Sequence, residues 1–490
     1  MITWGISANS HDAAVAVFDD NKLLFASHSE RFSGKKNDAD LCDNLVNYAA
    51  SRFGYPDDVV WYERPLVKTV RQLYAGQGFN HRSNDVRNYL RQFDLKGMPI
   101  HYQWHHESHA AAGFYTSPYK EAAVVVIDAI GEFETLTIWQ GSETGLKQVY
   151  KQRYPDSLGL WYSAMTQRCY LKPNEEEYIL MGMAAYGDPN KLYNRIAQDF
   201  FDFKTDRLFK LKKNLHRGCT DWAPDLTVND TFDIAAATQK IYEHFFDKII
   251  AHAKKITDSD NLIVMGGCAL NCLANPIAYN HFSNVWIMPN PGDAGSAVGA
   301  VLARNQQHIG WDTCSLGFDI NPTSSIEEIV DYLEKNKMCG VAQGRAEFGP
   351  RAFGNRSLLA DPRGPDIKDT VNDIKKRQQF RPFAPVILEE LALDYFDLCG
   401  NVSDHRYMQF ISRCRHPDLF PAIVHRDGTS RVQTVPKDGS RIRQLLEQWY
   451  DRTGCPMLLN TSLNIKGRPM VNDLADAEQF EQHYAVKVFR

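Results

Sequence analysis

The chain has 490 residues, of which 43% are hydrophobic and 23% charged, and its formal net charge is −5. This length predicts two or three domains, and the composition is that of a soluble globular protein. The slightly acidic balance argues against a general nucleic-acid binder, which carries a basic excess.

Nothing in the sequence resembles a targeting segment. The N-terminus has no basic leader, and no run reaches the ~18 apolar residues of a membrane-spanning helix. The ten cysteines form no CxxC pair, which is typical of reduced, buried thiols. We therefore expect a cytoplasmic protein without a membrane partner.

A pattern of strand, polar loop, strand, turn and strand occurs twice in the N-terminal part. The first polar loop holds His11 and Asp12, and the second holds Asp128 and Gly131. In duplicated folds such as actin, sugar kinases and Hsp70, two such loops face each other across a cleft that binds nucleotide phosphates. Chance repetition of common hairpins is the alternative. The expected strands are 2–7, 13–18 and 23–27 in the first copy, and 122–127, 135–139 and 146–150 in the second.

The segment 104–113 reads as a helix after its first residues. His105 and His109 are four residues apart and would share one helix face, whereas His106 would point elsewhere, with an i, i+3 pairing of His106 and His109 as the alternative. The zinc-protease pattern HExxH is absent because Ala110 takes the place of the second histidine. An isolated HxxxH pair is more often structural than metal-binding.

Two carboxylates make a metal-binding role for His105 and His109 more favourable than a structural one. Asp128 ends a buried strand, and Asp293 follows another expected strand at 285–288 and precedes a run of small residues. Two histidines and two carboxylates would suit iron, manganese or zinc. A further strand at 262–265 runs into Gly266 and Gly267, a turn that suits an adenosine or a phosphate but is a weak signal.

Three polar clusters mark the C-terminal part. Residues 343–363 contain four arginines (Arg345, Arg351, Arg356 and Arg363) among glycines. Arginine forks bind phosphate oxygens in pairs, and glycines let the backbone approach a ligand, although a charged surface loop is the alternative. Residues 372–385 and 458–464 add further cations, amides and hydroxyls, and the three clusters together predict a site for a phosphorylated ligand. The added side chains are Lys375, Arg377, Arg381, Asn460 and Ser462.

These three clusters resemble the C-terminal half of the NodU/CmcH family of O-carbamoyltransferases. The family patterns are approximately GRxEFGPRALGxRS, KxRxxFRPFAP and LNTSxN, and this sequence departs from them at Phe353 and Gln378. Family-like segments also occur around His11, His105, Asp128, Gly267 and Asp293. The resemblance thus covers nearly the whole chain, except for roughly residues 35–100 and 190–260.

The resemblance implies an α/β protein of two domains. Residues 1–310 would form a duplicated actin/Hsp70-like (ASKHA) domain with a metal and a nucleotide site. Residues 323–490 would form a YrdC-like domain that makes carbamoyl adenylate from carbamoyl phosphate and ATP, with Mg as the ATP counter-ion. The carbamoyl group would then pass to a hydroxyl of a small acceptor.

The resemblance also implies a role for each candidate residue. The metal, iron in the first instance with manganese or zinc acceptable, would lie on His105, His109, Asp128 and Asp293. The nucleotide in the same domain would contact Gly131, Gly266, Gly267 and Asn271. Carbamoyl phosphate and ATP would contact Arg345, Arg351, Arg356, Lys375, Arg377, Arg381, Asn460 and Ser462. The catalytic candidates are His11, Asp12, Lys375 and Arg381. From its place in the first polar loop, His11 in the N-terminal cleft is the candidate to orient or deprotonate the acceptor hydroxyl, and a structural histidine is the alternative.

Other functions stay open at this point. A tRNA threonylcarbamoyl-transfer enzyme is the nearest alternative, but it should have a basic face for tRNA. An ATP-driven kinase or switch would leave the arginine cluster without a purpose, and a non-enzymatic binding protein fits least well. The acceptor is open among antibiotic, sugar, oligosaccharide and nucleotide hydroxyls, and a homodimer is also left open.

Overall fold

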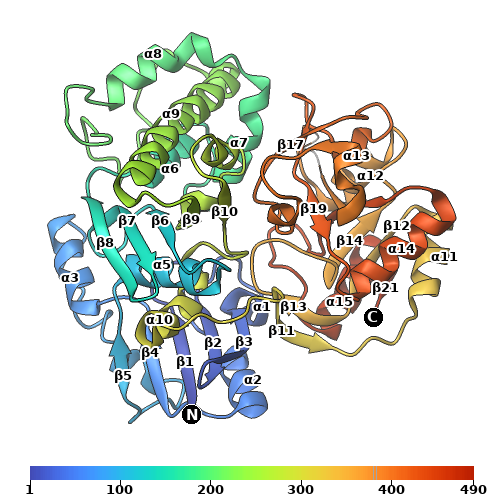
Figure 1. The fold of residues 1–490 in the computed structure, drawn as a ribbon, viewed down its shortest axis with the longest axis horizontal. Coiled ribbons are helices and arrows are strands. Elements are labelled where there is room, and N and C mark those ends of the chain that lie inside the picture. The colour runs from blue at the N-terminus through green and yellow to red at the C-terminus, as the bar shows by residue number, and fades with distance from the viewer. Residues whose placement is uncertain (379, 382) are drawn as a thin grey trace. The chain divides into compact units, whose positions relative to one another are not determined.

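The computed structural model describes residues 1–378, 380–381 and 383–490, and the chain forms two compact units (Figure 1). The first unit contains residues 1–10, 15–23 and 49–310. The second contains residues 311–490 together with two N-terminal segments, 11–14 and 24–48. The first unit thus ends at residue 310, and the two N-terminal segments group with the C-terminal unit.

Two five-stranded sheets have the same topology. In the first the order is β3-β2-β1-β4-β5, and in the second it is β8-β7-β6-β9-β10, so that each strand has a counterpart five positions on in the numbering. The central strands β1 and β6 pair in parallel with β4 and β9. This identity of strand order confirms the predicted duplication. The strands are β1 (Ile2–Ser7), β2 (Ala14–Asp19), β3 (Lys22–His28), β4 (Asp58–Trp61), β5 (Ile100–Tyr102), β6 (Ala122–Ile127), β7 (Glu134–Ser142), β8 (Gly145–Arg153), β9 (Asn261–Met265) and β10 (Asn284–Trp286).

The predicted strands lie within one or two residues of the observed ones, except that β7 and β8 extend further. The strands β4 and β5 lie in the part of the chain where the sequence was uninformative. They are short, and burial of β4 on both faces removes the alternating pattern that identifies a strand.

Helix α5 (His105–Thr116) packs against α10 (Ser296–Asn305) in the first unit. The contact is close because both helices carry small residues: a Cβ on Gly299 would lie 1.8 Å from the carbonyl oxygen of Ser108. Nearly all of α5 is buried, which places its histidines in the interior. The other helices that carry this unit are α3 (Pro65–Tyr74), α4 (Val86–Arg91), α6 (Leu158–Arg168), α7 (Glu177–Met183), α8 (Pro189–Phe200) and α9 (Thr231–Thr257).

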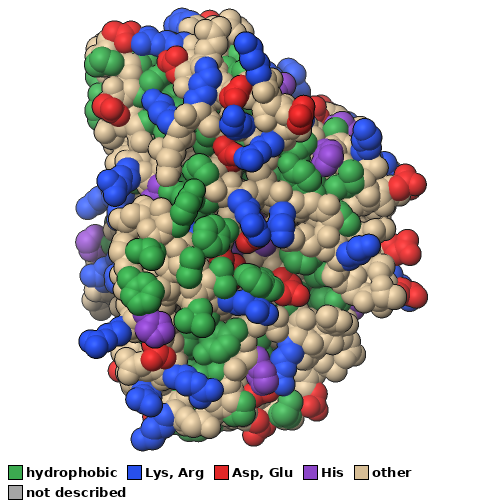
Figure 2. Space-filling model, turned by 90° about the vertical axis from the view of Figure 1, so that its left-hand side faces the viewer, with side chains coloured by type: hydrophobic (Ala, Val, Ile, Leu, Met, Phe, Trp, Pro, Cys, Tyr) green, Lys and Arg blue, Asp and Glu red, His purple; other side chains and the backbone are tan. Residues whose placement is uncertain are grey.

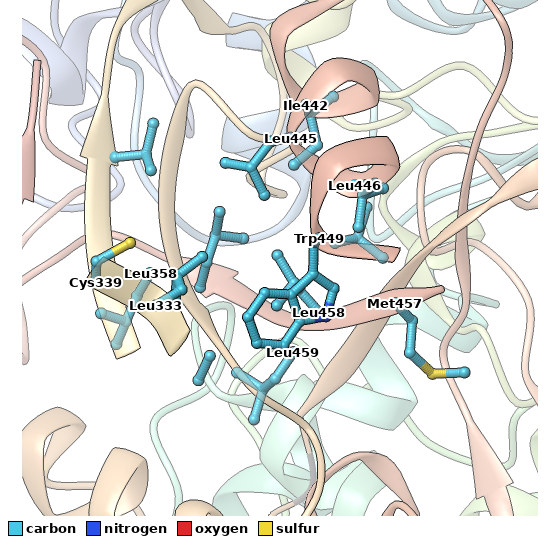
Figure 3. Close-up of a cluster of buried hydrophobic side chains, with 14 of the residues drawn as sticks. Leu333, Cys339, Leu358, Ile442, Leu445, Leu446, Trp449, Met457, Leu458 and Leu459 are labelled. Carbon is cyan, nitrogen blue, oxygen red and sulfur yellow. The ribbon is translucent and has the colours of Figure 1, made fainter. Parts of the chain in front are cut away.

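The second unit is built on a six-stranded mixed sheet of order β19-β15-β20-β14-β12-β21. Figure 3 shows part of its core, where Trp449 and leucines of α14 (Arg441–Thr453) lie over side chains of the sheet such as Leu458. The α/β class predicted for both halves of the chain is therefore confirmed. The strands are β12 (Met338–Ala342), β14 (Arg356–Ala360), β15 (Ala384–Leu388), β19 (Gln433–Val435), β20 (Met457–Ser462) and β21 (Val488–Phe489).

Shorter elements complete the second unit. A two-stranded sheet joins β11 (Ser315–Ile320) to β13 (Gly344–Glu347), and a three-stranded sheet has the order β16-β17-β18. The remaining elements are α1 (Ser29–Ser33), α11 (Ile326–Asn336), α12 (Ile367–Lys375), α13 (Ala392–Tyr395), α15 (Leu474–Tyr484), β16 (Phe396–Asp397), β17 (Ser412–Cys414) and β18 (Thr429–Ser430), with α2 (Asp43–Phe53) running from this unit into the first.

Among the described residues, no helix combines the length and the apolar character needed to cross a membrane. All ten cysteines are free thiols, and each is buried or half-buried.

Candidate functional site

Four side chains of the first unit converge on one point. His105 and His109 project from consecutive turns of α5, Asp128 follows β6, and Asp293 opens the turn that leads into α10. One ligand atom from each residue lies within 4.8 Å of every other. The His105 and His109 Nε2 atoms are 3.1 Å apart, and Asp293 Oδ1 lies 3.5 and 3.3 Å from them. The structure therefore brings together all four residues of the predicted metal set.

The chemistry of this donor set fits a divalent cation. Two ring nitrogens that face each other at 3.1 Å need a proton or a metal between their lone pairs. The two carboxylates supply the negative charge that a buried dication requires, and a mixed set of imidazoles and carboxylates suits iron, manganese or zinc. His106 stays outside the set, as expected, because its Nδ1 lies 3.0 Å from Thr137 Oγ1.

The carboxylates of the cluster favour the protonated form of the adjoining His105 imidazole. Burial disfavours the imidazolium of His105, but the charges of Asp293 and Asp128 raise its pKa to about 9. Burial also disfavours the carboxylate of Asp128, yet the hydrogen bond to His105 and the charge of His109 lower the pKa of Asp128 below its ordinary value. The site is thus strongly polarised, with negative charge placed to receive a cation.

The surroundings of the cluster hold its ligands in position. The carboxylate of Glu132 accepts hydrogen bonds from the backbone N–H groups of His105 and Arg64, which caps the first turn of α5. The ring of Tyr62 lies 5.2 Å from that of His105. Glu132 belongs to the second polar loop, but no role was predicted for it, because a single glutamate has no distinguishing spacing.

The predicted nucleotide residues have different surroundings. The backbone N–H of Gly267 donates to Asp128 Oδ1 at 3.1 Å, and a Cβ on Gly131 would lie 3.0 and 3.1 Å from the rings of His106 and His105. Both glycines therefore adjoin the cluster of His105, His109, Asp128 and Asp293, which we call the metal-type cluster. Gly266 has φ of +88°, and a Cβ there would lie 2.3 Å from the carbonyl oxygen of Ile127.

The side chain of Asn271 departs from the prediction. It exchanges two amide hydrogen bonds of 3.0 Å with Gln239, and its Oδ1 also accepts from the backbone of Ala274. These contacts hold the loop after β9, and the nucleotide contact of Asn271 stays a prediction.

A second polar site lies entirely within the second unit, as an arginine-lined pocket. Counting the part open to solvent, its empty volume is about 400 Å³. No Asp or Glu occurs among the described residues that line it. The lining residues include Arg351, Arg377, Arg381, Arg431, Asn460 and Ser462.

Elements distant in sequence supply this pocket. Asn460 and Ser462 end the central strand β20, and Arg377 and Arg381 follow α12. Gln379 and Pro382, which belong to the predicted basic run 372–385, lie outside the described residues. Asn460 Nδ2 donates to the carbonyl of Ala352 and to Gln433 Oε1, and its buried Oδ1 has no hydrogen-bond partner among the described residues.

Lys375, at the end of α12, is buried beside this pocket. Its Nζ donates to the carbonyls of Ser462 and Asn464 at 2.5 and 3.1 Å and to the Asn464 side chain. Burial holds the pKa of this lysine well below its ordinary value, and the charges of Arg377, Arg381 and Lys36 lower it further. The neighbourhood thus repels a further cation and would gain from a bound anion.

Two of the predicted phosphate ligands are structural. Arg356 is fully buried, and its guanidinium donates only to backbone carbonyls, those of Phe318, Gln343, Gly344, Asn355 and Asn472. Arg345 donates to the carbonyls of Leu24, Leu316 and Gly317. Neither lines the pocket, so the prediction for these two arginines is corrected: they organise the loop that presents Arg351.

The pair His11 and Asp12, which the sequence placed in the N-terminal cleft, groups with the second unit. His11 Nδ1 and Asp12 Oδ2 are 2.9 Å apart, and Asp12 has φ of +50°. Burial disfavours the Asp12 carboxylate, but its hydrogen bond to His11 and the charges of His11, His28 and Lys36 lower its pKa.

Arg431 is a pocket residue that the sequence did not reveal. It lies between the short strands β18 and β19, and no other Lys or Arg occurs within four residues of it in the sequence. The sequence signal that identified the other pocket residues was clustering of arginines, which a single arginine after a turn does not provide.

Comparisons with known proteins match both halves of the chain. The family model described as Carbamoyltransferase N-terminus matches residues 3–302, and Carbamoyltransferase C-terminus matches residues 330–489. The two matches fall on the two halves of the chain that carry the metal-type cluster and the arginine-lined pocket.

Similar proteins align over almost the whole chain. An uncharacterized protein of Synechocystis sp. is 32% identical over 96% of this chain and 93% of its own length. The nodulation protein NolNO of Sinorhizobium fredii is 29% identical over 95% of this chain and 76% of its own. The 3'-hydroxymethylcephem-O-carbamoyltransferase of Amycolatopsis lactamdurans is 27% identical over 95% of this chain and 94% of its own. With both family domains present in order, the chain belongs to the carbamoyltransferase family, of the NodU/CmcH type.

Proposed function

We propose that this protein is an ATP-dependent O-carbamoyltransferase that first makes carbamoyl adenylate and then transfers the carbamoyl group to a hydroxyl of a small molecule. The observation that carries the proposal is the arginine-lined pocket beside the buried Lys375, where several cations meet without a lining carboxylate. Such a pocket suits a ligand with more than one phosphate group.

The first step belongs to this pocket. Carbamoyl phosphate and ATP both carry negative charge and repel each other, so their reaction needs cations that neutralise both. Arg351, Arg377, Arg381 and Arg431 would serve this purpose. Water releases phosphate from carbamoyl phosphate, an oxygen of the resulting carbamate attacks the α-phosphorus of ATP, and pyrophosphate leaves. Asn460, with an unpaired buried oxygen, would accept a hydrogen bond from the carbamoyl amide.

The second step transfers the carbamoyl group. The acceptor oxygen attacks the carbonyl carbon of the adenylate, AMP leaves, and the hydroxyl proton passes to a base. We assign that base to His11, whose ring is held through Nδ1 by the carboxylate of Asp12. A cation held by His105, His109, Asp128 and Asp293 would polarise a bound phosphate or carbonyl oxygen.

A small hydroxylated acceptor is supported by the relatives, one of which is named for transfer to a hydroxymethyl group. The alternative, threonylcarbamoyl transfer to tRNA, needs a basic surface, whereas the net charge of the chain is −5.

The proposal is tested by isotope exchange and product analysis. With carbamoyl phosphate present, the purified protein should exchange labelled pyrophosphate into ATP, and omission of carbamoyl phosphate should stop the exchange. Mass spectrometry of a panel of sugars, aminoglycosides and hydroxymethyl compounds should then detect a mass gain of one carbamoyl group. Exchange that proceeds equally with threonine and bicarbonate in place of carbamoyl phosphate would favour the tRNA-modifying alternative.

A further inference from the structure

Helix α3 in the first unit has its polar face buried and its apolar face exposed. Leu66, Val70, Leu73 and Tyr74 are spaced at i, i+4, i+7 and i+8, and between 55% and 70% of each is exposed. Phe79, just after the helix, is 69% exposed. In a surface helix of a globular protein the apolar stripe normally faces the core, so this arrangement is reversed.

Buried polar contacts hold the helix in this orientation. Lys68 donates to Glu63 Oε1 at 2.6 Å and to the Asn9 carbonyl at 2.8 Å. Arg71 donates to the carbonyl of Glu132 and to Gln77, and Thr69 accepts from Asn84. Rotating the helix to bury its apolar stripe would separate Lys68 and Arg71 from these hydrogen-bond partners. A buried charge without a partner is strongly unfavourable.

The exposed face is continuous and uncharged. Between residues 65 and 79 the only charged side chains are Lys68 and Arg71, and both are buried. Figure 2 views the side of the molecule at which α3 lies in Figure 1, and it shows hydrophobic side chains gathered in the middle of that face with Lys and Arg side chains around them. At the start of the helix, Arg64 lies 4.4 Å over the ring of Trp104.

The area of this patch meets the requirement of a symmetric dimer. Aromatic side chains carry about 150–250 Å² each and the aliphatic ones somewhat less, so the five exposed fractions amount to roughly 500–600 Å² on one copy. A patch of this size is at the upper end for a monomer and is often functional. Two copies pressed together would bury about 1,000–1,200 Å², which reaches the threshold for a specific interface.

We propose that α3 is the dimer interface of this protein, with the apolar stripe of one copy packed against the same stripe of a second copy. A neutral stripe can face itself across a two-fold axis without opposing like charges, which is the condition for an isologous contact. A lipid surface is the alternative occupant, and vesicle flotation of the full chain distinguishes it from a second copy. The inference does not depend on the proposed transfer reaction.

Light scattering and sedimentation of the full chain test the proposal. The wild-type protein should have twice the 55.8 kDa mass of the chain, and Leu73→Glu should weaken dimerisation by at least about tenfold. Leu419→Glu is the matched control, because Leu419 lies in the second unit and is 60% exposed. It should remain a dimer. Both variants should keep the wild-type far-ultraviolet circular dichroism spectrum, since the substituted side chains are exposed.

A cross-link provides a second, independent measurement. Val70 is near the middle of the stripe, so Val70→Cys should pair with its own copy when a copper–phenanthroline oxidant is added, while Leu419→Cys should not. A monomeric wild-type protein, or a dimer unaffected by Leu73→Glu and not linked through position 70, would overturn the proposal. So would a monomer that floats with phosphatidylcholine vesicles through α3, since the occupant would then be lipid.

Discussion

Arg431 offers the sharpest test of the arginine-lined pocket, because it was found only in the folded structure. The change Arg431→Gln removes one positive charge from the pocket wall and keeps a polar side chain of similar length. The residue is half-buried in a loop between two short strands, and the substitution leaves the buried core of the second unit untouched. The expected loss therefore falls on anion binding and not on folding.

The magnitude follows from the charge that is lost. A hydrogen bond between an arginine and a phosphate or carboxylate contributes about 1.5–3 kcal/mol net. Since about 1.4 kcal/mol corresponds to tenfold, kcat/KM for carbamoyl phosphate or ATP should fall by about 10- to 140-fold. The three remaining pocket arginines, Arg351, Arg377 and Arg381, should preserve part of the activity.

The assay is pyrophosphate exchange into ATP, measured as a function of each substrate in turn. Arg413→Gln is the matched control, because Arg413 is exposed on the neighbouring strand β17 and does not line the pocket. It should retain wild-type kinetics. A change of less than twofold in Arg431→Gln, or an equal loss in Arg413→Gln, would refute the assignment of Arg431 to the anion site.

Three further outcomes are expected. His109→Ala should lose bound metal in elemental analysis while His106→Asn retains it, and full retention by His109→Ala would remove the cluster from consideration as a metal site. Arg356→Met should lower stability by about 4 kcal/mol or more and Tm by at least about 10 °C, because several buried carbonyls lose their donor; an unchanged melting curve would contradict a structural role. Lys375→Ala should abolish pyrophosphate exchange, whereas His11→Ala should keep the exchange and slow transfer by about 10²- to 10⁴-fold; equal loss of exchange in both would show that the two steps are not divided as proposed.

The metal-type cluster shows how far residue spacing can lead. The i, i+4 spacing of His105 and His109 was sufficient to place both on one helix face, and Asp128 and Asp293 were recognised because each follows a buried strand. Spacing identified the candidates, but only the packing of α5 against α10 and the sheet brings their ligand atoms within 4.8 Å. Such convergence depends on the angle and distance at which helices pack together, which the local sequence does not encode.

The C-terminal arginines show where the same reasoning failed. Density of arginine and glycine predicted one anion site, yet Arg345 and Arg356 donate to backbone carbonyls and Arg351 lines the pocket. A guanidinium has the same donors for a carbonyl and for a phosphate, so residue type does not distinguish the two uses. Burial does, and burial is a property of the folded chain.

The sequence by itself determined the class of fold, the duplication of strand patterns, the family and most of the residues that carry the two sites. Periodicity and motif spacing are local properties, so they can be recognised in the sequence without knowledge of the fold. The tertiary structure alone decided that residues 11–14 and 24–48 join the C-terminal unit, that Arg431 belongs to the pocket, and that α3 turns its apolar face outward. Each of these depends on contacts between residues distant in the chain, whose pairing is selected by the burial of apolar area and the satisfaction of buried charges.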